Sequence, residues 1–388
     1  MLIERRESFQ QKFPMEYYWT ATLTFTVVLL TLCGAAAGAA GGPFKHLFGI
    51  GDSFLDTGNR DPTNNTLLLP SDILVNQDYK HPYGLSLGAP VGRYSDGLVF
   101  FDFLAAALGL NPVAYRIYAA NPSQNSPADG VNFATAGAGV FTSYGFTTTG
   151  AQITELQGVL ATNNYNLSQS IVIYSVNGND YAAFLVKENS AAVISVFKVH
   201  FIKMHPHACM CGREVVGQIV ADVVRLVNLG FTNIAVTQLA PLGCEPVNTM
   251  SDGYTACDTL ENAFILLHNS LLVSNLSSTL PNANILFIDF YDAFYSIFDA
   301  SPGTTGFSSP ILKPCCAPTT TTSGCAYVDS NNQPLYTLCK NPAQSFFWDS
   351  EHPTQAGWSK IFNLLLTSST YTGGRRSLQC FLYPQLCQ

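Results

Sequence analysis

A serine near the N-terminus, and a histidine with an aspartate near the C-terminus, are the residues of this chain that could carry out nucleophilic chemistry. Ser53 lies in the segment GDSFL, directly after an apolar run where a first strand would end, and Asp349 and His352 lie in the segment DSEHP. A serine hydroxyl is a weak nucleophile until a base removes its proton. A histidine serves as that base when a carboxylate fixes its tautomer and stabilises the imidazolium. The pattern therefore predicts that the chain folds so that its two ends meet.

Two segments between these ends could supply the donors that stabilise an oxyanion. The segment GVNFATAGAG contains Gly137, and the segment NGNDY, which follows a strand-like apolar run, contains Asn179. A tetrahedral intermediate carries an oxyanion that needs preorganised donors. A glycine lets its backbone N–H approach closely, and an asparagine side chain supplies a further donor. With the backbone N–H of Ser53, these two residues would complete a hole with three donors.

The four segments GDSF, NFATAGAG, GND and DSEHP, in this order, resemble the plant GDSL esterase/lipase family of the SGNH hydrolase superfamily. The resemblance extends from about Phe44 to Leu366. It includes GRYSDG (92–97) and QLAPLGC (238–244), which are similar to the family's GRFSDG and PPLGC stretches. Each motif alone is weakly specific, whereas the ordered set is strongly specific.

The resemblance implies a role for each matching residue. Ser53 would be the nucleophile and the first oxyanion donor, with Gly137 and Asn179 as the second and third donors. His352 would be the base and Asp349 its partner.

The sequence departs from the family at three positions beside these residues. Phe54 replaces the leucine of the GDSL motif, and Ala136 and Asn177 stand where glycines are common. These departures concern the shape of the pocket more than its chemistry.

The composition of the 388 residues bounds the possible functions. The chain is 47% hydrophobic and 11% charged, which suffices for a large core and argues against disorder. The net charge is −8, and the basic patch that a nucleic-acid binder needs is not visible. We expect the partner to be a small-molecule, lipid or polysaccharide ester, with no nucleic acid, and the sequence leaves the oligomeric state open.

Residues 1–41 are typical of a signal peptide, with Met15 as an alternative start. Basic residues precede a mostly apolar run at 20–32, and small residues follow it. The alternative is a retained membrane anchor, but the run is shorter than the ~20 residues that a spanning helix needs. We expect a secreted protein of the apoplast or cell wall with no stable membrane span after cleavage, and a single domain at 42–388.

The cysteines also favour an oxidising compartment. Of 11 cysteines, Cys33 would leave with the signal peptide, so that an even number remains. We expect Cys244 to pair with Cys257 and the cluster at 315–339 to hold another bridge, although connectivity cannot be deduced from sequence. Three N-glycosylation sequons are compatible with secretion: Asn64, Asn166 and Asn275.

Short apolar runs without alternation predict buried strands of a parallel sheet. They lie at 46–50, 171–176, 233–237 and 285–290. Helical patterns lie at 96–110, 215–229 and 261–280. This alternation favours an α/β fold, a three-layer α/β/α sandwich with a central, mostly parallel sheet, as in SGNH-hydrolase and flavodoxin-like folds. Ligands of such folds bind beyond the carboxyl ends of the strands, where Ser53 and Asn179 both fall.

The segment 197–211, FKVHFIKMHPHACMC, does not fit the rest of the chain. The preferred interpretation is a doubtful insertion from a retained intron or a gene-model error. A flexible insertion is the first alternative. The second is a zinc site, although the spacing of the histidines and cysteines matches no ordinary zinc motif.

A second serine, Ser86, lies in a GLSLG segment that matches the GxSxG nucleophile motif. That motif needs a strand before it and a helix after it, whereas the flanking residues here predict a loop. We therefore assign Ser86 no catalytic role. Each chosen residue also has a structural explanation: Ser53 and Asp349 could cap helices, and Asn179 could stabilise a turn.

The function that these observations favour is a secreted serine hydrolase of carboxylic esters that requires no metal and no cofactor. An alternative within enzymes is an acyltransferase, in which an alcohol replaces water with the same residues. A less favoured alternative is a catalytically silent cell-wall or glycan-binding protein. The sequence does not identify the ester or its acyl length.

Overall fold

The computed structural model describes residues 43–60, 77–122, 127–141, 147–188, 205–301, 303–321, 323–373 and 376–387. At 184–188 and 205–211, the description is limited to the backbone. The predicted signal peptide, the sequon at Asn64 and the side chains of the doubtful insertion lie outside the described residues. The elements that position the predicted site all belong to one compact unit, Pro43–Gln388.

Six parallel strands form the central sheet in the order β2-β3-β1-β4-β5-β6. Their bounds are β1 His46–Gly51, β2 Val113–Ala114, β3 Val131–Asn132, β4 Ser170–Ser175, β5 Asn233–Thr237 and β6 Asn284–Ile288. The central strand β4 is buried at every position, as expected for a strand covered on both faces. The expected parallel sheet is therefore confirmed.

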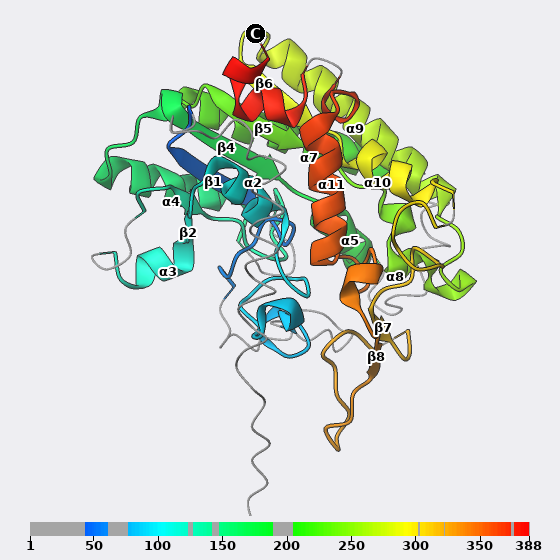
Figure 1. The fold of residues 1–388 in the computed structure, drawn as a ribbon. Coiled ribbons are helices and arrows are strands. Elements are labelled where there is room, and N and C mark those ends of the chain that lie inside the picture. The colour runs from blue at the N-terminus through cyan, green and yellow to red at the C-terminus, as the bar shows by residue number, and fades with distance from the viewer. Residues whose placement is uncertain are drawn as a thin grey trace, which may run out of the picture. The chain divides into compact units, whose positions relative to one another are not determined.

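Helices cover the two faces of the sheet, which makes a three-layer α/β/α sandwich (Figure 1). One face carries α4 (Thr149–Thr162), α7 (His205–Asn228) and α9 (Thr259–Thr279). The other carries α2 (Phe100–Leu108), α10 (Phe290–Phe298), α11 (Gln355–Thr367) and α12 (Leu378–Leu382). Successive residues of a strand point to opposite faces, so Ile173 packs into one core and Val172 into the other.

Shorter elements lie around the sandwich. They are α3 (Tyr115–Ala120), α5 (Asn179–Glu188), α8 (Pro246–Thr249) and an antiparallel pair, β7 (Cys316–Pro318) with β8 (Tyr336–Leu338). Within the described residues, no helix is both long enough and apolar enough to cross a lipid bilayer.

The described residues contain four disulfides, near α8, at the β7–β8 pair and at the C-terminal end of α12. Cys244 pairs with Cys257, as expected from the sequence. The 315–339 cluster holds two bridges rather than one, and the last bridge lies at the C-terminus: Cys315–Cys339, Cys316–Cys325 and Cys380–Cys387.

Three predicted element boundaries are wrong. The helix predicted at 96–110 begins only at Phe100, because Val99 is extended and donates its N–H to Asp102 at the start of the helix. The last predicted strand ends at Ile288, because Asp289 accepts a hydrogen bond from the N–H of Asp292 and so caps α10. The helix predicted at 215–229 begins earlier, at His205, so that α7 includes part of the doubtful segment.

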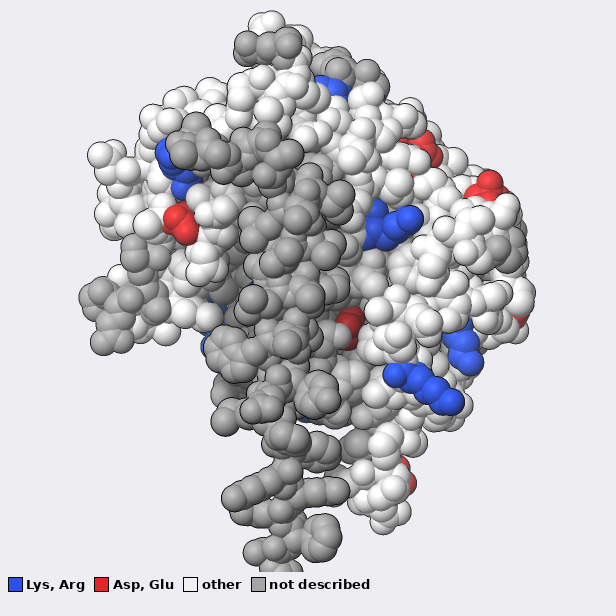
Figure 2. Space-filling model, viewed as in Figure 1, with Lys and Arg blue, Asp and Glu red and all other residues white. Residues whose placement is uncertain are grey.

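The surface carries few charges, in agreement with the composition. On the face shown in Figure 2, the described lysine, arginine, aspartate and glutamate side chains are scattered among uncharged residues.

Candidate active site

The predicted site residues follow three neighbouring strands of the sheet. Ser53 follows β1, Gly137 follows β3, and Asn179 begins α5 just after β4. Strand β1 lies between β3 and β4, where the chain changes its direction of travel across the sheet. Parallel α/β sheets bind ligands at this kind of switch point.

The structure brings Ser53, His352 and Asp349 into one hydrogen-bonded chain. The Oγ of Ser53 lies 2.8 Å from Nε2 of His352. The Nδ1 of His352 lies 2.9 Å and 3.0 Å from the two carboxylate oxygens of Asp349. All three distances are short enough for hydrogen bonds between a nucleophile and its base and between that base and its orienting group. All three residues are buried.

The DSEHP segment places Asp349 and His352 together by local bonding. One carboxylate oxygen of Asp349 accepts the backbone N–H groups of Glu351 (2.9 Å) and His352 (2.8 Å). The N–H of Trp348 donates to the carbonyl of His352, which closes the loop. Thr354 then caps α11 by accepting the N–H of Gly357. The helix cap is therefore Thr354, and Asp349 is bonded within the loop instead.

Two aromatic rings flank the imidazole of His352. The ring of Tyr94 lies 4.8 Å away between centroids, tilted by 32°, and the ring of Phe54 lies 6.0 Å away, edge-on. Phe54, which replaces the family's leucine, also packs edge-on against Trp358 at 4.9 Å. The larger side chain thus fills the space between the nucleophile segment and α11.

The GRYSDG segment forms hydrogen bonds with the residues that follow His352. The hydroxyl of Ser95 donates to the carbonyl of Pro353 (3.1 Å), and the carboxylate of Asp96 accepts the N–H of Gln355 (2.8 Å). The hydroxyl of Ser86 donates to the same carboxylate. Ser86 is exposed in a short 3-10 turn at Leu85–Leu87 rather than between a strand and a helix, which agrees with its interpretation as a loop residue.

Sequence reasoning missed Tyr83. Its buried hydroxyl donates a 2.7 Å hydrogen bond to the second carboxylate oxygen of Asp349. Its ring also packs edge-on against Tyr94. Nothing in the local sequence distinguishes this tyrosine from a loop residue, because its partner lies 266 positions away.

Burial and charge act in opposite directions on His352 and Asp349. Burial alone would lower the pKa of His352, but the charge of Asp349 and its hydrogen bond to the ring raise that pKa above its ordinary value. Burial would raise the pKa of Asp349, but His352 and the hydrogen bonds to the carboxylate, including that from Tyr83, hold it below its ordinary value. Asp349 is therefore a carboxylate at neutral pH, and it strengthens His352 as a base.

The side-chain amide of Asn179 lies between the other two predicted donor segments. Its Nδ2 donates to the carbonyl of Ala138 (3.0 Å), next to Gly137, and lies 3.4 Å from a carboxylate oxygen of Asp52, next to Ser53. Gly137 has a φ of 83°, a left-handed conformation that favours glycine. The three predicted donors are thus in adjoining segments.

Asp180 holds the Gly137 segment in place. Its two carboxylate oxygens accept the backbone N–H groups of Val140 and Phe141, each at 2.9 Å. The carboxylate lies so close to Gly139 that a Cβ added there would meet it at 2.5 Å. The last glycine of NFATAGAG is therefore required by this contact.

Asp52 links the nucleophile segment to the segment after β4. The buried carboxylate accepts the backbone N–H groups of Phe54 and Asn177. Burial raises the pKa of Asp52 to about 7, against these hydrogen bonds. The side-chain carbonyl of Asn177 in turn accepts the N–H of Ala240 (3.0 Å), so the asparagine at this position ties in the segment QLAPLGC.

The backbone before Ser53 is also fixed. The buried side chain of Gln152 makes two hydrogen bonds with Gly51. Its Oε1 accepts the N–H of Gly51 (2.8 Å), and its Nε2 donates to the carbonyl of Gly51 (2.9 Å). A Cβ at Gly51 would meet the carbonyl of Ser175 at 2.0 Å, so this position requires glycine.

Ala136, which stands where the family commonly has glycine, donates its backbone N–H to Asp56 (2.7 Å). The alanine side chain is compatible with this hydrogen bond.

The described residues include no group of three or more histidine, cysteine, aspartate or glutamate side chains that could hold a metal ion. The zinc alternative for 197–211 lies outside them.

Comparison with known proteins identifies extended similarity. Residues 47–365 match the family described as GDSL-like Lipase/Acylhydrolase. One GDSL esterase/lipase of Arabidopsis thaliana is 34% identical over 345 residues, which cover 84% of this chain and 88% of the relative. A second from the same plant is 32% identical over 340 residues, which cover 83% of this chain and 87% of the relative.

Among solved structures, an acetyl xylan esterase from Geobacillus stearothermophilus aligns with a TM-score of 0.30 at 14% sequence identity, over 66% of this chain and 81% of that chain. This likeness is too weak to support a statement about function.

Proposed function

The chain belongs to the GDSL-like lipase/acylhydrolase family and is a carboxylic ester hydrolase; on that premise we propose that it acts through Ser53, His352 and Asp349. The observation that carries the proposal is the continuous hydrogen-bonded chain from Ser53 Oγ through the imidazole to the Asp349 carboxylate. The same relation of nucleophile, base and orienting carboxylate recurs on unrelated folds.

In the proposed reaction, Nε2 of His352 takes the proton of the Ser53 hydroxyl as Oγ attacks the ester carbonyl carbon. The C–O bond to the alcohol then breaks, and the imidazolium returns its proton to the leaving alkoxide. Water, deprotonated by the same histidine, attacks the carbonyl carbon of the acyl-enzyme. The bond from that carbon to Ser53 Oγ breaks, the imidazolium returns its proton to Oγ, and the acid is released. Asp349 stabilises the imidazolium in both steps.

The oxyanion of each tetrahedral intermediate needs donors that are in place before the reaction. We assign this role to the backbone N–H groups of Ser53 and Gly137 and the side-chain amide of Asn179. The support is the position of Asn179 between Asp52 and Ala138, together with the carboxylates of Asp52 and Asp180 that hold the backbone on both sides.

The same residues would support transfer of the acyl group to an alcohol other than water. This alternative predicts that added alcohols give ester products in place of the free acid. Nothing in the geometry of Ser53 and His352 favours one acceptor over the other.

We further propose that the protein is secreted to the apoplast or cell wall, with residues 1–41 removed and residues 42–388 as the mature domain. Four disulfides are consistent with an extracellular protein. The sequons at Asn166 and Asn275 are exposed, as glycosylation requires. Mass spectrometry of the secreted protein, before and after enzymatic deglycosylation, tests both points.

The experiment that tests the catalytic proposal measures hydrolysis of p-nitrophenyl esters from acetate to palmitate, with Ser53→Ala as the control. A serine-reactive phosphonate should label the wild-type protein at Ser53. Failure of labelling in a folded, disulfide-bonded sample would favour the catalytically silent alternative.

A further inference from the structure

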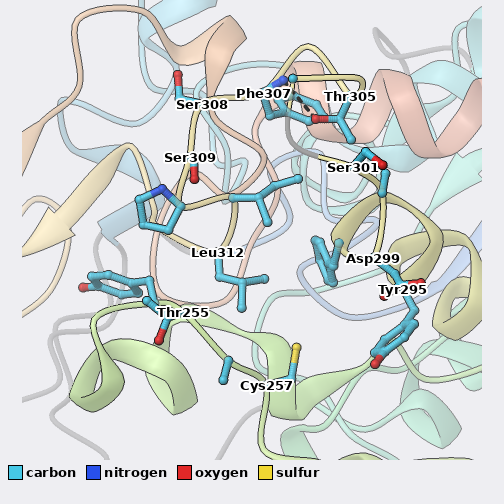
Figure 3. Close-up of a pocket in the computed structure, with 17 residues that line it drawn as sticks. Thr255, Cys257, Tyr295, Asp299, Ser301, Thr305, Phe307, Ser308, Ser309 and Leu312 are labelled. Atoms are coloured by element: carbon cyan, nitrogen blue, oxygen red, sulfur yellow. Dashed lines mark hydrogen bonds between the residues drawn. The ribbon is translucent and has the colours of Figure 1, made fainter.

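An open pocket of about 370 Å³ lies between the loop that precedes α9 and the loop that follows α10. Figure 3 shows Thr255 and Cys257 on one side, Asp299 and Ser301 on the other, and Leu312 between them. None of these residues belongs to the candidate active site.

The lining combines aromatic rings with hydroxyl groups. The rings are those of Tyr254, Tyr295, Phe298 and Phe307, and the aliphatic hydroxyls are those of Thr255, Ser301, Thr305, Ser308 and Ser309. Leu312 is buried at the base, whereas Tyr295 is 41% exposed. The ring of Tyr295 stacks on that of Tyr291 at 5.9 Å.

This lining favours one class of ligand over two others. Two of the lining hydroxyls bond within the protein, since that of Thr255 donates to the carbonyl of Asp252 (2.7 Å) and that of Thr305 accepts the N–H of Phe307 (3.2 Å). An acyl chain would exclude water from the three serine hydroxyls, at a cost in free energy. An anion would be repelled by Asp299, the single charged residue among the described residues that line the pocket. A neutral sugar ring offers partners to the hydroxyl groups and carries no charge that Asp299 would repel. Its C–H faces pack on aromatic rings, and its hydroxyls exchange hydrogen bonds with serine, threonine and aspartate side chains.

A turn at Tyr254 forms part of the pocket wall. The φ of this tyrosine is 63°, in the left-handed region that non-glycine residues rarely adopt. Its N–H donates to the carbonyl of Thr249 (2.8 Å), which holds the turn.

Two connections join the pocket to the loop that carries His352. The rings of Phe298 and Phe307 pack edge-on against Phe346, at 4.9 Å and 5.5 Å, in the segment that leads to Asp349. On the other side, the Cys244–Cys257 disulfide ties the pocket wall to the segment before α8. Within α8, the N–H of Val247 donates to the carbonyl of Ser350 (2.9 Å).

We propose that this pocket binds a neutral saccharide unit of a polysaccharide ester, and so positions the glycan part of the substrate beside the catalytic loop. The proposal rests on the ester hydrolase function for the statement that the glycan belongs to the substrate. Binding of the saccharide itself does not depend on ester cleavage.

The test is isothermal titration calorimetry of the full mature chain with xylohexaose, cellohexaose and mannohexaose, and with trigalacturonate as the anionic comparison. We expect saturable binding of at least one neutral hexasaccharide and at least tenfold weaker binding of trigalacturonate. Tyr295→Ala should weaken the neutral interaction at least tenfold. Leu267→Ala, which removes a similarly exposed apolar side chain from α9 outside the pocket, should leave it unchanged.

Asp299→Asn is the second variant, which keeps the shape of the side chain and removes its charge. It should retain neutral binding within about threefold and reduce the discrimination against trigalacturonate. Absence of saturable binding for all three neutral sugars, or equal binding by wild type and Tyr295→Ala, would overturn the proposal.

A parallel assay separates this proposal from the catalytic one. Hydrolysis of p-nitrophenyl acetate should be unchanged in Tyr295→Ala, whereas KM for an acetylated form of the bound polysaccharide should rise at least fivefold. Sugar binding without any ester hydrolysis by the wild type would reject the catalytic proposal alone. Hydrolysis without sugar binding would reject the saccharide site alone.

Discussion

The hydroxyl of Tyr83 donates a 2.7 Å hydrogen bond to the carboxylate of Asp349, which it reaches from a loop 266 positions earlier in the chain. This bond occupies the carboxylate oxygen that does not accept the backbone N–H groups of the DSEHP loop. It therefore orients Asp349 toward His352 and withdraws negative charge from it, and both effects can be measured.

Tyr83→Phe should lower kcat/KM about tenfold, because part of a hydrogen bond to a charged group, worth about 1.5–3 kcal/mol, is lost. Since the Tyr83 hydroxyl lowers the pKa of Asp349, its removal makes the carboxylate more basic and raises the pKa of His352 further. The acid limb of the pH–rate profile should therefore move to higher pH. An unmoved limb would show that Tyr83 only fills space.

Asp349→Asn should move the same limb in the opposite direction. The pKa of His352 is raised by Asp349, and the reaction needs the neutral imidazole, so activity rises as pH increases through that raised pKa. Without the carboxylate charge, the pKa falls and the limb moves to lower pH. The rate should drop across the whole profile, by on the order of 10⁴ as for other triads.

The pKa of the buried Asp52 carboxyl is raised to about 7 by burial, so this group also contributes to the pH–rate profile. Because the charges of Asp52 and His352 shift each other's pKa, the acid limb belongs to the coupled pair, and the comparison of the two profiles measures how Asp349 shifts that limb. The measurement is a pH–rate profile on a soluble ester, with folding checked by circular dichroism. An Asp349→Asn enzyme as fast as wild type would mean that another group holds His352.

Ser53→Ala should abolish ester turnover, with a loss on the order of 10⁶ in kcat, and should prevent labelling by a phosphonate. Ser86→Ala is the matched control, because Ser86 bonds to Asp96 in an exposed turn, apart from the hydrogen-bonded chain that contains Ser53. It should retain both turnover and labelling. Peptide mapping that finds the label on Ser86 would reject the assignment.

Asn179→Ala should lower kcat by about 10²–10³, or ~3–4 kcal/mol, while KM stays nearly constant, since a donor to the oxyanion acts in the transition state. The buried neighbour Asp52 would also lose a contact with the amide. Thermal unfolding of the variant distinguishes the two effects. A variant with wild-type kcat, or one that does not fold, would remove Asn179 from the mechanism.

The closeness of Asp349 and His352 could be predicted from sequence because it is local. Three positions separate them, and the aspartate bonds to the backbone N–H of the histidine itself. The order of the four motifs and the apolar runs before Ser53 and Asn179 likewise predicted a parallel sheet with the site at its carboxyl edge. The short strands β2 and β3 escaped prediction, because two residues are too few to show a period.

The contact between Ser53 and His352 could not be predicted from local sequence, since 299 positions separate the two residues. The fold of the whole domain brings Ser53 Oγ within 2.8 Å of His352 Nε2. Chemistry required this contact, but no local pattern contains it. Tyr83 and the ring contacts of Phe54 are similar cases, because burial and long-range packing depend on the whole chain. The sequence by itself thus determined the reacting groups and their order. The tertiary structure decided which loop residues support them, because hydrogen bonds and ring contacts between distant segments exist only once the layers have packed.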